Sequence, residues 1–118
     1  MPAISKVSAI TIRVAEMRRS MRFYRDLLGL TVQYGGDEDY FASLNISNFF
    51  LNLEVTKEPV NHWGRIIFYC DDVDEMYSYL RREGYDPGEP KDSTWGERFF
   101  HLEDPDGHEL SFAKPLTR

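Results

Sequence analysis

The sequence has a single cysteine, no long apolar run and no excess of positive charge, and each shortage excludes a class of protein. Cys70 alone permits no internal disulfide, and its apolar neighbours indicate a packed side chain in a reducing cytoplasm. No segment approaches the roughly twenty apolar residues of a membrane span, and residues 1–6 lack the apolar region of a signal peptide. A net charge of −6 disfavours nucleic acid as a partner.

Several catalytic signatures are also missing. The chain has no glycine-rich loop of the kind that cradles phosphates, no cysteine pair and no nucleophile elbow. What it does have is 118 residues, of which 42% are hydrophobic, and this is enough to bury a core. We therefore expect one globular, cytoplasmic domain over residues 1–118, with neither membrane nor nucleic acid as a partner.

The first half of the chain predicts a strand, a helix and three further strands. Alternating apolar residues indicate the strands, and apolar residues at helical spacing indicate the helix, which ends at Gly29. The strands are expected at 7–14, 30–34, 40–44 and 48–55, and the apolar side of the helix consists of Met17, Met21, Tyr24 and Leu28.

The second half repeats this order. A strand at 64–70 is followed by Asp72, which with Glu75 forms a capping box that starts a helix. The helix ends at Gly84, and a short extended segment at 86–90 precedes a final hairpin at 99–112. The two halves align with one offset, because Ala9 and Arg65, like Glu16 and Asp72, lie 56 positions apart. An internal duplication explains this better than coincidence, with one module at about 6–56 and the other at about 62–115.

The hairpin turn is the clearest local signal. Pro105 presets its own backbone angle, Asp104 and Asp106 can accept hydrogen bonds from nearby amides, and Gly107 tolerates positive φ. The turn alone predicts only a hairpin.

Together these features resemble the vicinal oxygen chelate superfamily, which contains glyoxalases, bleomycin-resistance proteins and extradiol dioxygenases. The resemblance covers essentially the whole chain. It implies an α+β fold in which paired β-α-β-β-β modules form a curved mixed sheet, a cup with helices outside. It also implies a homodimer and a small organic ligand inside the cup. The matching segments are the doubled element order, residues 20–30, and Trp95-Gly96-Glu97-Arg98-Phe99-Phe100 leading into the turn at 104–107.

The resemblance also places a divalent metal in the cup of many members, held by His on each first strand and Glu on a last strand. Here the matched positions hold Ala9, Asn52, Arg65 and Ser111. Alanine cannot ligate, a guanidinium offers no lone pair, and isolated Ser or Asn binds a metal poorly. We therefore expect no metal and no other cofactor at the usual site.

Strand parity then indicates which side chains line the cup, since residues two apart share a face. Arg65 admits two interpretations: an ion pair with Glu54 or Glu97, or a clamp for a ligand anion. His101 is either a wall residue or a proton-transfer group, whereas His62 and His108 are given no chemistry and no common site. The candidate ligand-binding residues are Thr11, Phe50, Asn52, Arg65, Tyr69, Trp95, Glu97, Phe99, His101 and Ser111.

Two functions fit these residues. The first is a binding protein that sequesters a drug or metabolite, and the second is an isomerase, lyase or transferase, either metal-free or with a metal at an unorthodox site. No catalytic residue is assigned, and the identity and charge of the ligand stay open, because the cup contains both Arg and Glu.

Overall fold

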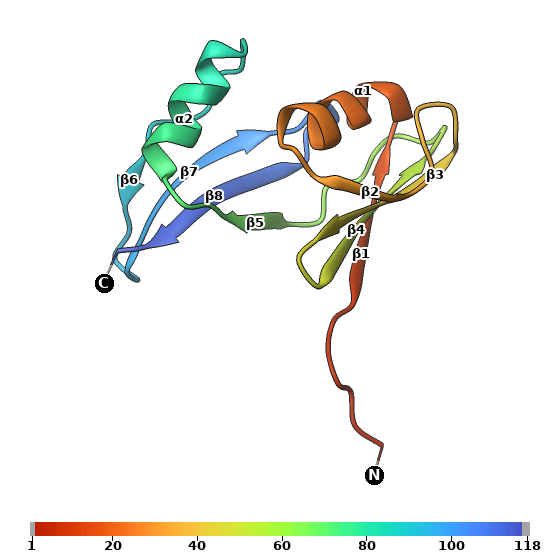
Figure 1. Cartoon of the computed structure of the whole chain (residues 1–118), viewed down its shortest axis with the longest axis horizontal. Helices are drawn as coiled ribbons and strands as arrows, with labels where there is room; N and C mark the ends of the chain where they lie inside the picture. Colours follow the sequence, from red (N-terminus) through yellow and green to blue (C-terminus); the bar gives the residue numbers. More distant parts are fainter. Residues whose placement is uncertain (1, 117–118) are drawn as a thin grey trace. The chain divides into compact units, whose positions relative to one another are not determined.

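The computed structural model describes residues 2–116 and divides into two compact units, Met1–Asn61 and His62–Arg118. Each unit contains one β-α-β-β-β module with a four-stranded mixed sheet (Figure 1). The predicted α+β class and the repeated order of elements are confirmed. No helix in the described part of the chain has the length and apolar character needed to cross a membrane.

The first unit orders its strands β1-β4-β3-β2. β1 pairs with β4 in parallel, and the other pairs are antiparallel. Its elements are β1 (Ala9–Val14), α1 (Met17–Met21), η1 (Arg22–Leu27), β2 (Thr31–Tyr34), β3 (Phe41–Ile46) and β4 (Phe49–Val55).

The helix of this unit differs from the regular helix that the spacing predicts. After α1 the turns widen into the π-helix η1, in which the Leu28 amide donates to the Phe23 carbonyl at 3.0 Å. The wider turn buries both Phe23 and Tyr24 completely, although they are neighbours in sequence. Gly29, with a φ of 78°, ends the helix as predicted.

The second unit repeats the order as β5-β8-β7-β6, again with one parallel pair, β5 and β8. The 56-residue offset holds in detail: Ala9 and Arg65 each begin a first strand, and Glu16 and Asp72 each precede a helix as its N-cap. Its elements are β5 (Arg65–Tyr69), α2 (Val73–Arg82), β6 (Lys91–Asp92), β7 (Glu97–Glu103) and β8 (Glu109–Pro115).

Helix α2 begins where the capping pattern predicts. The Asp72 carboxylate accepts a hydrogen bond from the Glu75 amide at 3.0 Å, which satisfies one of the unpaired donors of the first turn. Gly84, with a φ of 96°, follows the last turn. The helix packs against β7 and β8, with Val73 and Leu80 buried.

The short strand before the hairpin is not where the sequence predicts it. Residues 86–90 form no strand, and β6 lies at Lys91–Asp92, paired with Phe99 and Arg98. Pro87 and Pro90 explain the shift, because neither can donate to a strand ladder.

The predicted hairpin turn is confirmed. Asp104 is only 5% exposed, and its Oδ1 accepts from the amides of Asp106 (2.8 Å) and His108 (2.9 Å). Gly107 has a φ of 88°, as a left-handed turn position requires. This turn fixes the pairing of β7 with β8.

Alternation along β7 and β8 gives the second sheet two different faces. Phe100 and Phe112 stack at 5.1 Å and lie under α2, where Tyr77 meets Phe100 edge-on at 5.7 Å. Leu102 and Leu110 are buried on the same face. The residues between them therefore point away from the helix.

Candidate functional site

The face of the second sheet opposite α2 carries the candidate site. Pairing aligns Tyr69 with Ala113 and Phe99, and Ile67 with Ser111 and His101, in successive rows across β5, β8 and β7. A hollow with a cavity volume of about 100 Å³ opens on this face. Its lining residues are Arg65, Ile67, Trp95, Glu97, Phe99, His101, Ser111 and Ala113.

His101 connects the two polar neighbours of the hollow. Its Nδ1 lies 2.8 Å from the Ser111 hydroxyl, and its Nε2 lies 3.4 Å from Nη1 of Arg65. Because a guanidinium can only donate, Nε2 must accept, so the ring proton is on Nδ1 and is donated to Ser111. Ser111 is 4% exposed and thus holds the imidazole from beneath.

Within the second unit, Arg65 pairs with Glu109 and not with the expected Glu97. The structure places Glu109, its register partner, 3.4 Å from Nη1, whereas Glu54 and Glu97 have other partners. An ion pair of two side chains exposed by 44% and 49% contributes little, because water screens it. Within the second unit, the contacts that the structure gives Arg65, with Glu109 and His101, both go through Nη1, so neither uses the N–H groups of Nε and Nη2.

Glu97 holds two aromatic side chains in place. One carboxylate oxygen accepts from the Tyr69 hydroxyl, and the other accepts from the Trp95 indole N–H at 3.1 Å. The hydrogen bond to Glu97 raises the pKa of the Tyr69 phenol, so this hydroxyl stays protonated and keeps donating. Ser93 fixes Glu97 in turn, since each residue donates its amide to the other.

Three large side chains of this face, two aromatic and one aliphatic, are open to solvent. Trp95 is 68% exposed, Tyr69 63% and Ile67 57%. Trp95 stacks on Phe99 with ring centroids 5.5 Å apart, and Phe99 contacts the His101 ring at 5.1 Å. Contiguous exposed apolar groups bordered by polar ones are typical of a binding surface.

Three of the ten candidate residues lie on the sheet of the first unit. Thr11 and Asn52 are register partners, and the Asn52 amide donates to the Thr11 hydroxyl at 3.2 Å. Phe50 lies on the same face and is half-buried. At the far end of this face, Glu54 lies 3.6 Å from Arg13 and accepts from the Tyr40 hydroxyl at 3.4 Å. The polar groups of this face thus contact one another.

The residues at the family's metal positions do not suit a metal ion. Ala9 has no donor atom, Asn52 directs its amide N–H to Thr11, and Ser111 is engaged by His101. Arg65 is a fixed cation. In the described part of the chain, no three His, Cys, Asp or Glu side chains are grouped so that they could hold a metal.

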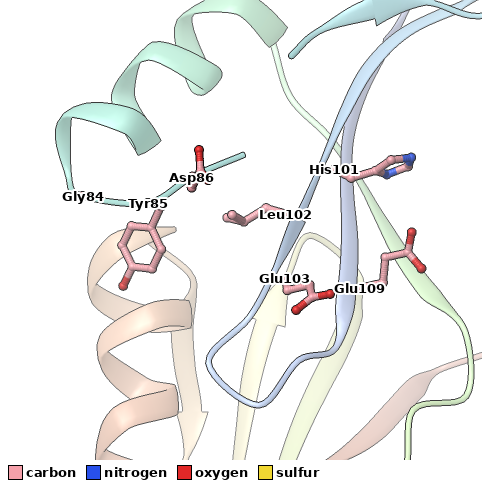
Figure 2. A pocket seen from close by; sticks show the side chains of 7 residues that line it. All are labelled: Gly84, Tyr85, Asp86, His101, Leu102, Glu103 and Glu109. Carbon is pink, nitrogen blue, oxygen red and sulfur yellow. The ribbon is translucent and has the colours of Figure 1, made fainter. Parts of the chain in front are cut away.

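A larger hollow, of about 490 Å³, lies at one end of the same unit (Figure 2). It runs from Tyr85 and Asp86, just after α2, to the hairpin strands, and His101 is the only candidate residue that borders it. Asp86, Glu103 and Glu109 make its lining acidic, and Figure 2 shows their side chains spread around the opening rather than pointing to one spot.

Two histidines that the sequence did not connect lie together. The rings of His62 and His108 are 5.3 Å apart, and Nε2 of His62 donates to the Asp106 carbonyl at 2.9 Å. Their spacing in the sequence does not indicate this contact, which by itself forms no chemical site in the described part of the chain. Their contact attaches residue 62 to the hairpin turn, away from the hollow that His101 lines.

Comparisons with known proteins agree with this architecture. Residues 6–112 match the family model of the Glyoxalase/Bleomycin resistance protein/Dioxygenase superfamily. The glyoxalase domain-containing protein 4 of Rattus norvegicus is 28% identical over 119 residues, which cover 91% of this chain. The chain spans 40% of the length of that relative.

Solved structures share the fold. A lactoylglutathione lyase from Agrobacterium tumefaciens superposes with a TM-score of 0.79 at 18% identity, over 94% of each chain. A superfamily member from Sphaerobacter thermophilus gives 0.77 at 23% identity, over 93% of this chain and 97% of its own. At these identities the likeness concerns the fold alone.

Proposed function

The chain belongs to the Glyoxalase/Bleomycin resistance protein/Dioxygenase superfamily, and from that premise we propose that it binds a small organic molecule on the exposed face of its second sheet. The single observation that carries the proposal is the grouping of open aromatic rings with the partly unused guanidinium of Arg65 around one hollow. In this proposal the protein sequesters its ligand unchanged. A homodimer in the cytoplasm belongs to the same proposal.

The exposed but fixed aromatic rings of the lining support ligand binding over a purely structural role. A structural sheet face is covered by other side chains, as Phe100 and Phe112 are by α2. Here Trp95 and Tyr69 stay open although hydrogen bonds to Glu97 hold them in position. Holding exposed rings in one position costs side-chain entropy. In a binding site this cost is offset, because rings that are already fixed lose less entropy when the ligand binds.

An enzyme is the second candidate, and one observation favours it. The Nε2 lone pair of His101 accepts from Arg65, and it becomes a base next to an anion-stabilising group when a ligand anion takes over the guanidinium. Such a pair suits proton transfer in an isomerase or lyase. A metal at the superfamily's usual positions has no part in this chemistry, because the residues there do not suit one.

One experiment separates the two functions. The purified protein is incubated with a panel of metabolites and antibiotics, and bound molecules are recovered by ultrafiltration and analysed by mass spectrometry. We expect a molecule recovered unchanged in equimolar amount, with retention lost in Arg65→Gln and kept in the control Arg82→Gln on α2. Turnover to a product that His101→Gln abolishes would replace sequestration by catalysis. Retention that is equal in both arginine variants would refute the site.

A further inference from the structure

We infer that the ligand is a small planar aromatic carboxylate, with its ring in a trough over β8 and its carboxylate on Arg65. This inference rests on the proposed function, since it specifies what the same face binds. Three features of the second unit support it. They are the sizes of the side chains on three neighbouring strands, the hydrogen bonds that the charged groups already make, and the distance between the ring-binding and anion-binding groups.

The trough follows from the sizes of the side chains across the sheet. The central strand β8 contributes only Ala113 and Ser111, which are 1% and 4% exposed. The strands on either side contribute large groups in the same rows, Ile67 and Tyr69 from β5 and Phe99 and His101 from β7. The backbones of β5 and β7 lie two strand spacings apart, about 10 Å. Bulky side chains on both sides narrow this width, so a flat ring fits better than a thick aliphatic one.

The sign of the ligand charge follows from which charged group still has hydrogen-bonding groups that its contacts within the second unit do not use. Each carboxylate oxygen of Glu97 already accepts a hydrogen bond, from Tyr69 and from Trp95. A cation that drew the Glu97 carboxylate away from these donors would release both rings. Arg65, in contrast, uses only Nη1, in two contacts of 3.4 Å. The paired N–H groups of a guanidinium match a carboxylate in bidentate geometry. An anion therefore fits this face, and Glu97 acts as a positioning residue for the walls.

The size of the ligand follows from the separation of the two subsites. The contact between Arg65 and His101 brings the guanidinium beside the row of Ile67, Ser111 and His101. The row of Tyr69, Ala113 and Phe99 is the next one, about 7 Å along the strands. A carboxylate attached to one ring directly or through one methylene spans this step. The hollow of about 100 Å³ is smaller than the ~150 Å³ of a cavity that accepts benzene, which limits the ligand to one small ring.

The test uses four probes of matched size: phenylacetate, cyclohexylacetate, phenylacetamide and benzylamine. Binding is measured by chemical-shift titration of the full chain. We expect phenylacetate to bind tightest, about fivefold tighter than phenylacetamide, because an ion pair on an open face contributes up to about 1 kcal/mol and each 1.4 kcal/mol is tenfold in affinity. Arg65→Gln should remove this preference, whereas Arg82→Gln, on the far side of the sheet, should keep it.

Other outcomes overturn the inference in different ways. Tighter binding of benzylamine, lost in Glu97→Gln, would assign the face to cations, and equal binding of cyclohexylacetate would remove the requirement for a flat ring. Binding of no probe would overturn the aromatic carboxylate, while the wider ligand panel still decides whether the face binds any small molecule. A separate measurement tests whether Glu97 positions the Trp95 ring in the absence of ligand. In a Trp63→Phe background, where Trp95 is the remaining tryptophan, we expect Glu97→Gln to change the Trp95 fluorescence.

Discussion

Replacing Phe112 by alanine tests the face assignment on which the site depends. Phe112 lies on β8 between Ser111 and Ala113, but its ring points to the opposite face and is 2% exposed. It stacks on Phe100 at 5.1 Å and lies 5.6 Å from Phe68, so its removal opens a hole in the centre of the aromatic layer under α2. The matched control is Phe99→Ala, since Phe99 is half-buried on the site face.

The magnitude follows from the cavity. Truncating a fully buried Phe to Ala costs about 3–5 kcal/mol, because transfer free energy is lost and the surrounding side chains close the hole only in part. Phe112→Leu keeps most of the volume and should cost about 1–1.5 kcal/mol. Phe99→Ala leaves no sealed hole, and about half of the ring's apolar burial is lost, so about 1 kcal/mol is expected.

The assay is urea denaturation followed by circular dichroism, with amide exchange in β7 and β8 reporting the second unit alone. We expect Phe112→Ala to lower the free energy of unfolding by at least 2 kcal/mol more than Phe99→Ala, as the ranges above imply. Equal costs, or a larger cost for Phe99→Ala, would refute the assigned faces and with them the site.

Three further predictions concern local contacts. Asp72→Ala should lower the free energy of unfolding by about 1 kcal/mol in denaturation experiments, because the Glu75 amide loses its cap; no change would show that the cap contributes nothing. Gly107→Ala should lower the free energy of unfolding by more than about 1 kcal/mol, since φ is 88° and the new Cβ would lie 3.0 Å from the His62 ring. Adding His62→Ala should restore part of this stability, and no recovery would show that the whole cost comes from backbone strain. The Tyr69 phenol, followed by ultraviolet absorbance, should ionise above its ordinary value of 10.0, and its contribution to stability should be complete below that pH and lost as the pH rises past the raised pKa; an unchanged titration in Glu97→Gln would contradict the pairing.

Much of the fold could be predicted because its signals are local. The Asp72 cap and the turn at Asp104 depend on residues within four positions of one another, and the structure confirms both. The π-helix and the position of β6 could not be predicted in this way. The wider turns of the π-helix bury both Phe23 and Tyr24 where the spacing indicates regular turns, and two prolines displace β6. Cys70 is half-buried, and burial raises the pKa of its thiol, in agreement with the packed side chain that the sequence predicts.

The sequence could predict which candidate residues share a face of the sheet, but not all of the contacts between them. Parity placed Arg65, Tyr69, Phe99 and His101 on one face, because alternation needs no knowledge of long-range contacts. Which residues contact Arg65 depends on the register in which the strands pair. Once the hairpin turn is centred on Asp106, His101 must face Ser111 and Glu103 must face Glu109, so the His101–Ser111 pair was available from the sequence. The parallel pairing that brings Glu109 to Arg65 was not, since nothing local indicates it.

The most direct test of the central claim is a map of where a bound small molecule perturbs the protein. Amide chemical shifts are recorded for the full chain with and without the ligand recovered from the panel, or with phenylacetate. We predict the largest changes at Ile67, Tyr69, Phe99, His101 and Ala113, the rows of the hollow opposite α2. Changes confined to Tyr85, Asp86 and Glu103 would instead place the ligand in the acidic hollow of Figure 2 and contradict the account.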